Sequence, residues 1–434
     1  MLHIHETFQK PQRPERVIQF GEGRFLRGFV DWLLKKLNDS GLFCGSAVIV
    51  QPMPTGFCEK LEKQNGLYTH IIRGVEGVET SVIDVVSRCV NPYEDFQAFL
   101  KLADNPEFRF IVSNTTEAGI SYVDEPFPTD KAPVSFPAKV TALLYRRFKN
   151  GMDGFILLPC ELIDRNADNL KKLVLRYAEQ WGLEPEFAAW VCEKNHFCCT
   201  LVDRIVTGPS KDDKTDYIDE MLNASEYFHL WVIEGDKALA DEIPFHKAGL
   251  NVLWTDDLEV YRTRKVRILN GAHTSTVAYA LLNGIDTVKD CMENETMLQH
   301  LRKCVFEEII PSMDLPEEEM VSYANDVLTR FANPYIEHHW SDIALNSVSK
   351  FKVRVLPSLL GYYEKFGKCP EGLARAFGSL IRFYKAGAPR DDAGIIEKMK
   401  ALSVKEILQN EEWWGQDCSF LYEKVAPYAA EPQR

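Results

Sequence analysis

The N-terminal part of the chain begins with an apolar run, a glycine turn and a helical pattern, in that order. The apolar run is Arg16–Phe20, and Gly21 and Gly23 follow it directly. Beyond them, large apolar residues recur at spacings of three and four, as on one face of a helix; they are Phe25, Phe29, Trp32, Leu33 and Leu37. A strand, a glycine turn and a helix form the opening unit of a dinucleotide-binding fold. The sequence therefore predicts a Rossmann-like domain here.

Strand and helix patterns continue to alternate through the first half of the chain. Short apolar runs that suit strands buried on both faces are residues 47–50, 109–113 and 155–158. Helical patterns accompany them at residues 93–102, 138–148 and 166–180. This alternation predicts a mostly parallel sheet with right-handed crossovers.

After about residue 241 the pattern becomes almost entirely helical. The helical segments are residues 256–282, 296–308, 316–331, 343–366, 373–384 and 393–408. A chain of 434 residues is too long for one simple core. We therefore expect an α/β fold, with a Rossmann-like domain over residues 1–240 and a mainly α-helical domain over residues 241–434.

Composition and charge exclude several classes of partner. The formal net charge of −14 argues against nucleic acid, because phosphate binding needs clustered lysine and arginine. No apolar run is long enough to span a bilayer, and residues 1–16 lack the apolar core of a signal peptide. The 11 cysteines form no C-x-x-C pair, and no zinc-site spacing occurs. We expect a cytoplasmic protein with reduced thiols, no metal site and no membrane partner.

The most chemically suggestive residues lie in one predicted helix of the second domain. Lys265, Asn270 and His273 fall on one broad side of it, since Asn270 lies about 140° and His273 about 80° round from Lys265. Val266 and Leu269 share that arc, so this side is expected to face the interior. Burial would lower the pKa of the lysine toward a value useful for proton transfer. The arrangement suits an enzyme that removes a proton from a hydroxyl without a metal.

A simpler interpretation of this helix is a solvated basic face. Lys265 lies among Arg262, Arg264 and Arg267, which is typical of such a face. Against that reading stands Gly271, which costs about 1 kcal/mol relative to alanine at a mid-helix position. A glycine there requires a reason, such as the close approach of a ligand.

Polar residues follow the predicted strands at the edge where open parallel sheets bind ligands. Thr115 and Glu117 come after the strand at residues 109–113, and Glu161 and Asn166 come after the strand at residues 155–158. A carboxylate at such an edge can relay protons between solvent and a site, which favours Glu117. Thr115 and Glu161 could equally cap the helices that follow.

The glycine turn itself predicts the kind of cofactor. Gly21 and Gly23 would let the backbone approach a pyrophosphate at the start of the next helix, although Leu26 holds the third glycine position. The acid usually found at the end of the second strand is replaced by Gln51. We expect NAD as cofactor, with NADP left open.

Together these segments resemble the polyol-specific long-chain dehydrogenases, the mannitol dehydrogenase family. Its signature is a lysine, an asparagine five residues on and a histidine three beyond, as in Lys265, Asn270 and His273. The other matching segments are Phe20–Phe25 with Arg27, Thr116–Glu117, Phe136–Lys139, Leu201–Arg204 and Trp231–Glu234. The resemblance implies reversible hydride transfer between NADH and the keto group of a sugar.

The resemblance also implies residue roles. Lys265 would be the general acid and base, Asn270 would hold the reacting oxygen, and His273 would orient substrate hydroxyls, with Glu117 linking the lysine to solvent. The residues expected to contact substrate are Asp203, Asn166 and Lys350. The residues expected to form the cofactor site are Phe20, Gly21, Gly23, Phe25, Arg27 and Thr115.

Further segments favour the members of the family that reduce a hexuronate to an aldonate. They are Pro159–Asp164, Arg330–Pro334 and Ala344–Ser347. Two positions depart from the family pattern: Leu162 replaces an asparagine that bonds the reacting oxygen, and Asp342 replaces an arginine eight residues before Lys350. The alternatives are a member that acts on fructuronate or mannitol and, more distantly, a non-catalytic nucleotide-sensing protein.

Overall fold

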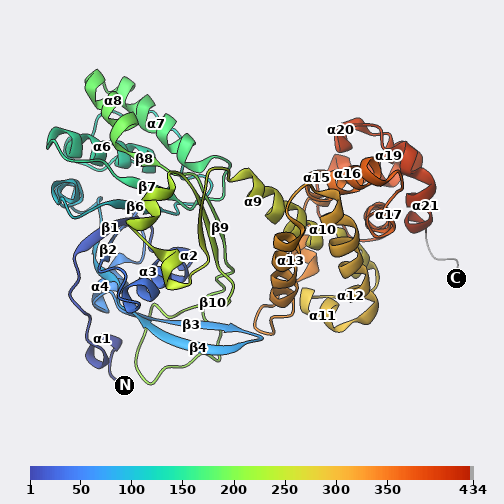
Figure 1. Ribbon diagram of the computed structural model, residues 1–434, viewed down its shortest axis with the longest axis horizontal. Helices are drawn as coiled ribbons and strands as arrows, with labels where there is room; N and C mark the ends of the chain where they lie inside the picture. Colours follow the sequence, from blue (N-terminus) through green and yellow to red (C-terminus); the bar gives the residue numbers. More distant parts are fainter. Residues whose placement is uncertain (431–434) are drawn as a thin grey trace. The chain divides into compact units, whose positions relative to one another are not determined.

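The computed structural model describes residues 1–430 of the 434-residue chain. The chain divides into two compact units, Met1–Leu258 and Glu259–Arg434, coloured blue to yellow-green and yellow to red in Figure 1. The boundary expected near residue 241 falls inside the first unit. Strand β12 (Val252–Thr255) lies beyond that boundary and pairs with β11 (Leu230–Glu234), which keeps this segment with the first unit.

A six-stranded sheet forms the centre of the first unit. Its order is β5-β2-β1-β6-β7-β8, and every neighbouring pair is parallel, which confirms the predicted parallel sheet. The strands are β1 (Glu15–Phe20), β2 (Ser46–Val50), β5 (Val86–Val90), β6 (Phe110–Ser113), β7 (Ile156–Pro159) and β8 (His196–Phe197). The chain builds outward from β1 on one side and then returns to add β6 on the other. This reversal between β1 and β6 is the switch point at which such sheets bind ligands.

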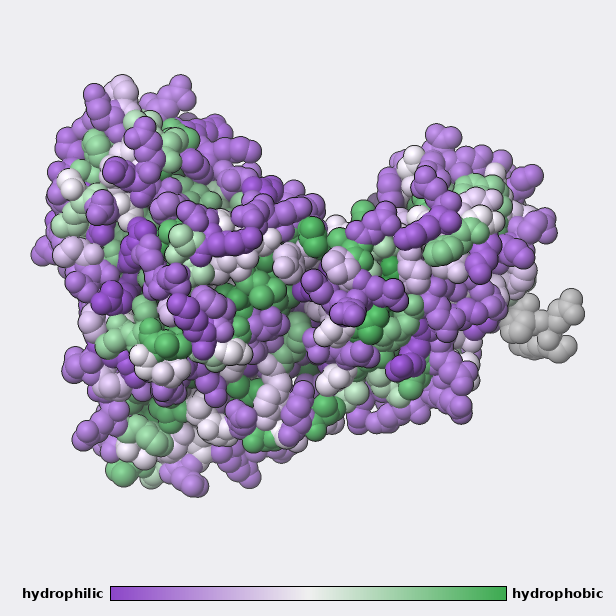
Figure 2. Space-filling view, viewed as in Figure 1, coloured by the Kyte–Doolittle hydropathy of each residue, from purple (hydrophilic) through white to green (hydrophobic). Residues whose placement is uncertain are grey.

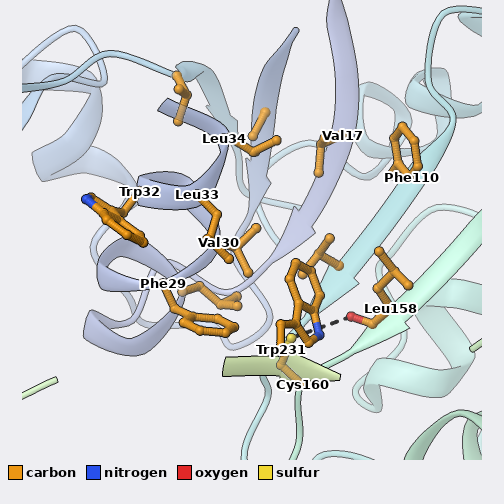
Figure 3. Packing of buried hydrophobic residues seen from close by; sticks show 14 of the residues in the cluster. Val17, Phe29, Val30, Trp32, Leu33, Leu34, Phe110, Leu158, Cys160 and Trp231 are labelled. Atoms are coloured by element: carbon orange, nitrogen blue, oxygen red, sulfur yellow. Dashed lines mark hydrogen bonds between the residues drawn. The ribbon is translucent and has the colours of Figure 1, made fainter. Parts of the chain in front are cut away.

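Helices cover both faces of this sheet, as the alternation of strand and helix predicts. On one face, Val30, Leu33 and Leu34 of α3 pack near Val17 of β1, with Trp231 beside them (Figure 3). On the other face, Phe20 meets Phe99 and Phe136 edge-on, with ring centroids 5.9 and 5.0 Å apart. The helices of this unit are α1 (Ile4–Thr7), α2 (Arg24–Gly28), α3 (Val30–Asp39), α4 (Cys58–Lys63), α5 (Phe96–Leu100), α6 (Phe136–Lys149), α7 (Asn166–Gln180) and α8 (Pro185–Lys194).

Two smaller sheets were not predicted from the sequence. They consist of β10 (Asn223–Ser225), β3 (Tyr68–Gly74) and β4 (Gly77–Ile83), and of β12, β11 and β9 (Thr200–Asp203). All seven positions of β3 are buried although three carry polar side chains. Their partners are distant in sequence: Thr69 bonds Tyr217, His70 bonds Ser225 and Arg73 bonds Asp213. A local pattern therefore cannot identify β3 as a buried strand.

The second unit is helical, as predicted, but two long predicted helices are each divided. Val355 separates α15 from α16, and Pro357 stands in the first turn of α16, where it cannot donate to a preceding turn. Ser403 caps α19 through a capping box with Glu406 and so ends the pattern of α18. The helices are α9 (Glu259–Arg264), α10 (Gly271–Leu282), α11 (Val288–Glu293), α12 (Glu295–Arg302), α13 (Glu317–Phe331), α14 (Trp340–Ile343), α15 (Ser347–Arg354), α16 (Leu356–Phe366), α17 (Glu371–Ala386), α18 (Ala393–Ala401), α19 (Val404–Leu408), α20 (Glu411–Trp414) and α21 (Tyr422–Ala429).

On the face drawn in Figure 2, hydrophilic residues cover most of the surface, and apolar residues appear in scattered patches. Within residues 1–430, no helix has the length and apolar character needed to cross a lipid bilayer.

Candidate functional site

The glycine turn after β1 is open to a ligand. Gly21 has φ +122°, a value that favours glycine, and its N–H donates to Val50 O at 3.1 Å. A Cβ on Gly21 would lie 3.2 Å from Asn114 O, so this backbone lies close to the end of β6. A Cβ on Gly23 would have no atom of residues 1–430 within 4 Å. The exposed backbone at Gly23 therefore fits the close approach of a pyrophosphate.

Two residues of this motif that are expected from the sequence to bind the cofactor have buried side chains. Phe20 is fully buried in the core of the sheet. Arg27 is 4% exposed, and its Nε donates to the main-chain oxygen of Glu22 at 3.0 Å. Both residues shape the turn from within. Phe25, by contrast, is half-buried and stacks on Phe29, with centroids 5.1 Å apart.

A buried carboxylate joins the ends of β6 and β7. Glu161 accepts from the N–H and hydroxyl of Thr115 at 2.8 and 2.9 Å and from the hydroxyl of Ser113 at 3.0 Å. Burial raises the pKa of Glu161, and these hydrogen bonds oppose the rise. The hydroxyl of Thr115 is thus engaged by protein, and the pair holds the loop at the switch point in place.

The loop after β6 carries a strained residue beside the expected proton relay. Thr116 has φ +73°, a conformation that a β-branched residue rarely adopts. Such strain is concentrated at functional sites, where surrounding structure maintains it. Glu117 follows in an exposed turn, so its carboxylate is in contact with solvent.

Asn166, expected from the sequence to contact substrate, is buried and hydrogen-bonded within the first unit. Its side chain is 1% exposed. The amide group donates to the main-chain oxygens of Pro159, Glu161 and Thr200, and the amide oxygen accepts from the N–H groups of Thr200 and Ala167. These bonds use its whole hydrogen-bonding capacity. Asn166 therefore ties the end of β7 to the start of β9.

We expect Asn166→Ala to lower the free energy of unfolding by about 3 kcal/mol, because it leaves several buried main-chain groups without partners. Asn169→Ala is the matched control on the same helix, since Asn169 makes one side-chain bond, to Asp164 O at 2.9 Å. Urea unfolding of both variants measures the difference. Equal losses of stability in the two variants would contradict the structural role.

Two other positions singled out in the sequence lie near these strand ends. Asp203 is the last residue of β9, is 5% exposed and stands opposite Leu230 of β11. Leu162 follows Glu161 directly and is 62% exposed, so an apolar side chain occupies the place of the family's asparagine. It can offer no hydrogen bond to a reacting oxygen.

In the second unit, Lys265–Asn270 forms a π-helix between α9 and α10. Hydrogen bonds in a π-helix join residues five apart, so Asn270 lies about one turn from Lys265. The 140° separation expected from the sequence assumes α-helical geometry, and the wider π-turn brings Asn270 closer to the side of Lys265 than that value. Lys265, Asn270 and His273 are all half-buried, and Leu269 is buried. Single π-turns inside helices are rare and are found frequently at functional sites.

Aromatic rings fix the position of His273. Its centroid lies 4.3 Å from Phe331, 5.2 Å from His338 and 6.1 Å from Trp340. His338 is half-buried, and burial lowers its pKa. No local signal in the sequence indicated this contact, which depends on the packing of residues 331–340 against α10.

Gly271 has a packing explanation, not the ligand approach expected from the sequence. A Cβ there would lie 3.1 Å from the main-chain oxygen of Arg354, at the end of α15. Lys350 of the same helix donates to Ile343 O at 2.9 Å, and burial lowers its pKa, with Arg354 and Arg390 as further causes. Asp342 is bound by Arg390 at 3.1 Å.

The structure contains neither a disulfide nor a metal-binding cluster among residues 1–430. All 11 cysteines are free thiols. Across the described residues, 1–430, no three His, Cys, Asp or Glu side chains form a group that could hold a metal ion.

Comparisons with known proteins agree with this architecture. The mannitol dehydrogenase Rossmann domain matches residues 15–247, and the mannitol dehydrogenase C-terminal domain matches residues 257–417. An altronate oxidoreductase of Pectobacterium carotovorum is 44% identical, covering 95% of this chain and 92% of its own. One from Escherichia coli O6:K15:H31 is also 44% identical, covering 94% and 92%.

Two solved structures share the fold at low identity. D-sorbitol dehydrogenase in substrate-free form has a TM-score of 0.84 and 21% identity, covering 99% of this chain and 97% of its own. Pseudomonas fluorescens mannitol 2-dehydrogenase, in a ternary complex with NAD and D-mannitol, has a TM-score of 0.67 and 21% identity, covering 96% and 91%. The chain belongs to the mannitol dehydrogenase family.

Proposed function

We propose that this protein is an NAD-dependent oxidoreductase that interconverts D-tagaturonate and D-altronate in the cytoplasm. The observation that carries the proposal is identity of 43–44% to altronate oxidoreductases over at least 93% of the chain. The spacing of Lys265, Asn270 and His273, which resembles the family's signature, supports the proposal. Lys265 and Asn270 lie in a π-helix that continues into α10, where His273 lies. Small sugar acids are the proposed partners.

The first unit binds the cofactor in this proposal. The open backbone at Gly23 and the switch point between β1 and β6 fit a dinucleotide pyrophosphate. The chemistry that NADH supplies when bound is a hydride for the carbonyl carbon of the sugar. Phe25 and Thr115 lie at the same edge of the sheet and complete the proposed cofactor site, with Phe20 and Arg27 supporting the turn.

Lys265 moves the proton. In reduction its ammonium donates a proton to the carbonyl oxygen as the carbon gains a hydride, and in oxidation the neutral amine removes that proton from the hydroxyl. Asn270 donates a hydrogen bond to the same oxygen and stabilises its developing charge. Since Leu162 cannot assist, these two residues carry that stabilisation.

The remaining residues orient the substrate and exchange protons. His273, held by three aromatic neighbours, orients substrate hydroxyls. Lys350, near Arg354 and Arg390, provides positive charge for the substrate carboxylate. Asp203 contacts the substrate, and Glu117 passes protons to solvent.

A panel of keto sugars tests the proposal. D-tagaturonate, D-fructuronate and D-fructose are each mixed with NADH, and the loss of NADH absorbance is followed. We expect the highest kcat/KM for tagaturonate. Preference for fructuronate or fructose would indicate another member of the family, and NADH binding without turnover of any of the three would indicate a nucleotide-sensing protein.

A further inference from the structure

The end of β2 lacks the group that usually recognises the cofactor's ribose. In dinucleotide-binding sheets an acid there accepts from the ribose 2′-hydroxyl and disfavours a 2′-phosphate. Here Gln51 occupies that position, and its Nε2 donates to Met53 O at 2.9 Å and Pro54 O at 3.3 Å. The amide of Gln51 therefore organises the following loop.

A cavity of about 620 Å³ opens beside Gln51, at the carboxyl ends of β2 and β5. Four acids are among its lining residues: Glu59, Glu62, Glu94 and Asp95. Arg88 is the one lysine or arginine that lines it, and its guanidinium is bound by Glu15 at 2.8 and 2.9 Å. The lining thus carries an excess of negative charge, which is unsuited to a phosphate dianion.

The carboxylate of Glu22 lies next to Gly56, one of the residues that line this cavity. A Cβ on Gly56 would lie 2.0 Å from Glu22 Oε1 and 2.7 Å from the side chain of Gln51, and both Gly56 and Gln51 line the cavity. Glu22 is 6% exposed, and its Oε1 accepts from the N–H of Phe57 at 3.2 Å. Its Oε2 has no hydrogen-bond partner among the described residues.

That arrangement gives a buried acid with one acceptor atom unused. An unsatisfied carboxylate oxygen inside a protein is unfavourable and requires an explanation, such as a ligand. The nearby cation does not fill the need, because Arg27 donates its Nε to the main-chain oxygen of Glu22. Glu22 stands between Gly21 and Gly23, so it is also adjacent to the expected position of the pyrophosphate.

We propose that Glu22 supplies the acid that β2 lacks: it accepts from the ribose 2′-hydroxyl of NAD and repels the 2′-phosphate of NADP. This rests on the dinucleotide binding of the proposed function and names the residue that sets cofactor specificity. Repulsion is strong there because the carboxylate lies away from water, where charges are poorly screened.

Glu22→Gln tests the proposal in the full chain. The substitution keeps the shape and the acceptor for Phe57 N–H but removes the charge. Calorimetry with NAD and with NADP gives the ratio of their dissociation constants, and we expect the preference for NAD to fall by about tenfold or more. Glu179→Gln is the matched control, since it removes one charge from an exposed side chain of α7 that does not line the cavity, and it should leave the ratio nearly unchanged.

A second measurement needs only the unmodified protein and so holds even if the variant fails to fold. Loss of the 2′-hydroxyl in 2′-deoxy-NAD should weaken binding by about tenfold. Equal affinity for NAD and 2′-deoxy-NAD, or an unchanged ratio in Glu22→Gln, would overturn the role proposed for Glu22 and would leave the proposed function standing. Failure of the unmodified protein to bind either dinucleotide would instead overturn the proposed function.

Discussion

Replacing Lys265 with alanine is expected to lower kcat by about 10⁴-fold while the dissociation constant of NADH changes by less than about twofold. The loss is large because, in the proposed mechanism, the lysine both transfers the proton and stabilises charge on the reacting oxygen, and each effect contributes about 10²-fold or more. The proposed cofactor site lies in the first unit, so the affinity for NADH should persist. Single-turnover oxidation of NADH with tagaturonate measures the first quantity, and NADH fluorescence measures the second.

Two further variants make this prediction specific to proton transfer. Lys400→Ala removes an exposed lysine of α18 in the same unit and should leave kcat unchanged. Adding ethylamine to Lys265→Ala should restore part of the lost turnover, because a free amine can take over the transfer. Near-normal turnover without added amine would remove Lys265 from the proposed chemistry.

The sequence predicted four of the six strands of the main sheet, because those four carry a local signal, and it missed β5 and β8. Ser46–Val50 and Phe110–Ser113 are buried at every position and so appear as short, continuous apolar runs. The hairpin strand β3 carries no such signal, since the partners of its buried polar residues lie at least 140 positions away. The burial of β3 depends on pairing with residues distant in the sequence, and a local sequence pattern carries no information about such pairing.

The π-helix at Lys265–Asn270 could not be predicted for a related reason. Its residues have ordinary helix propensities, and an α-helical pattern runs through them without interruption. The wider turn depends on packing. A Cβ added to Gly271, directly after the π-helix, would lie 3.1 Å from the main-chain oxygen of Arg354. The sequence identified the three side chains but misplaced two of them relative to each other.

Family motifs indicated candidate site residues but did not show which of them are buried. Phe20 and Arg27 belong to matching segments and Asn166 follows one, yet all three are buried and held by contacts within the protein. Glu22 lies inside the glycine-turn motif. The sequence does not show that Phe57 N–H occupies one of its carboxylate oxygens while the other has no partner among the described residues. Burial and hydrogen-bond partners, which require the fold, make that distinction.

The two glycines of the turn should respond in opposite ways to the same substitution. Gly23 has φ −65°, a value that any residue adopts, and space around its Cβ position, so Gly23→Val should fold normally. The added side chain would occupy the space through which a pyrophosphate approaches the backbone. We expect NADH affinity to fall by about 100-fold, through loss of charge-assisted hydrogen bonds to main-chain N–H groups.

Gly21→Val is the comparison that separates binding from folding. Gly21 has φ +122°, and its Cβ would lie 3.2 Å from Asn114 O, so valine should destabilise the fold by about 2 kcal/mol or more. Thermal melting and NADH fluorescence on both variants give the two readouts. Unchanged NADH affinity in a folded Gly23→Val variant would mean that the pyrophosphate does not lie at this turn, because a bulky side chain cannot share the space with it.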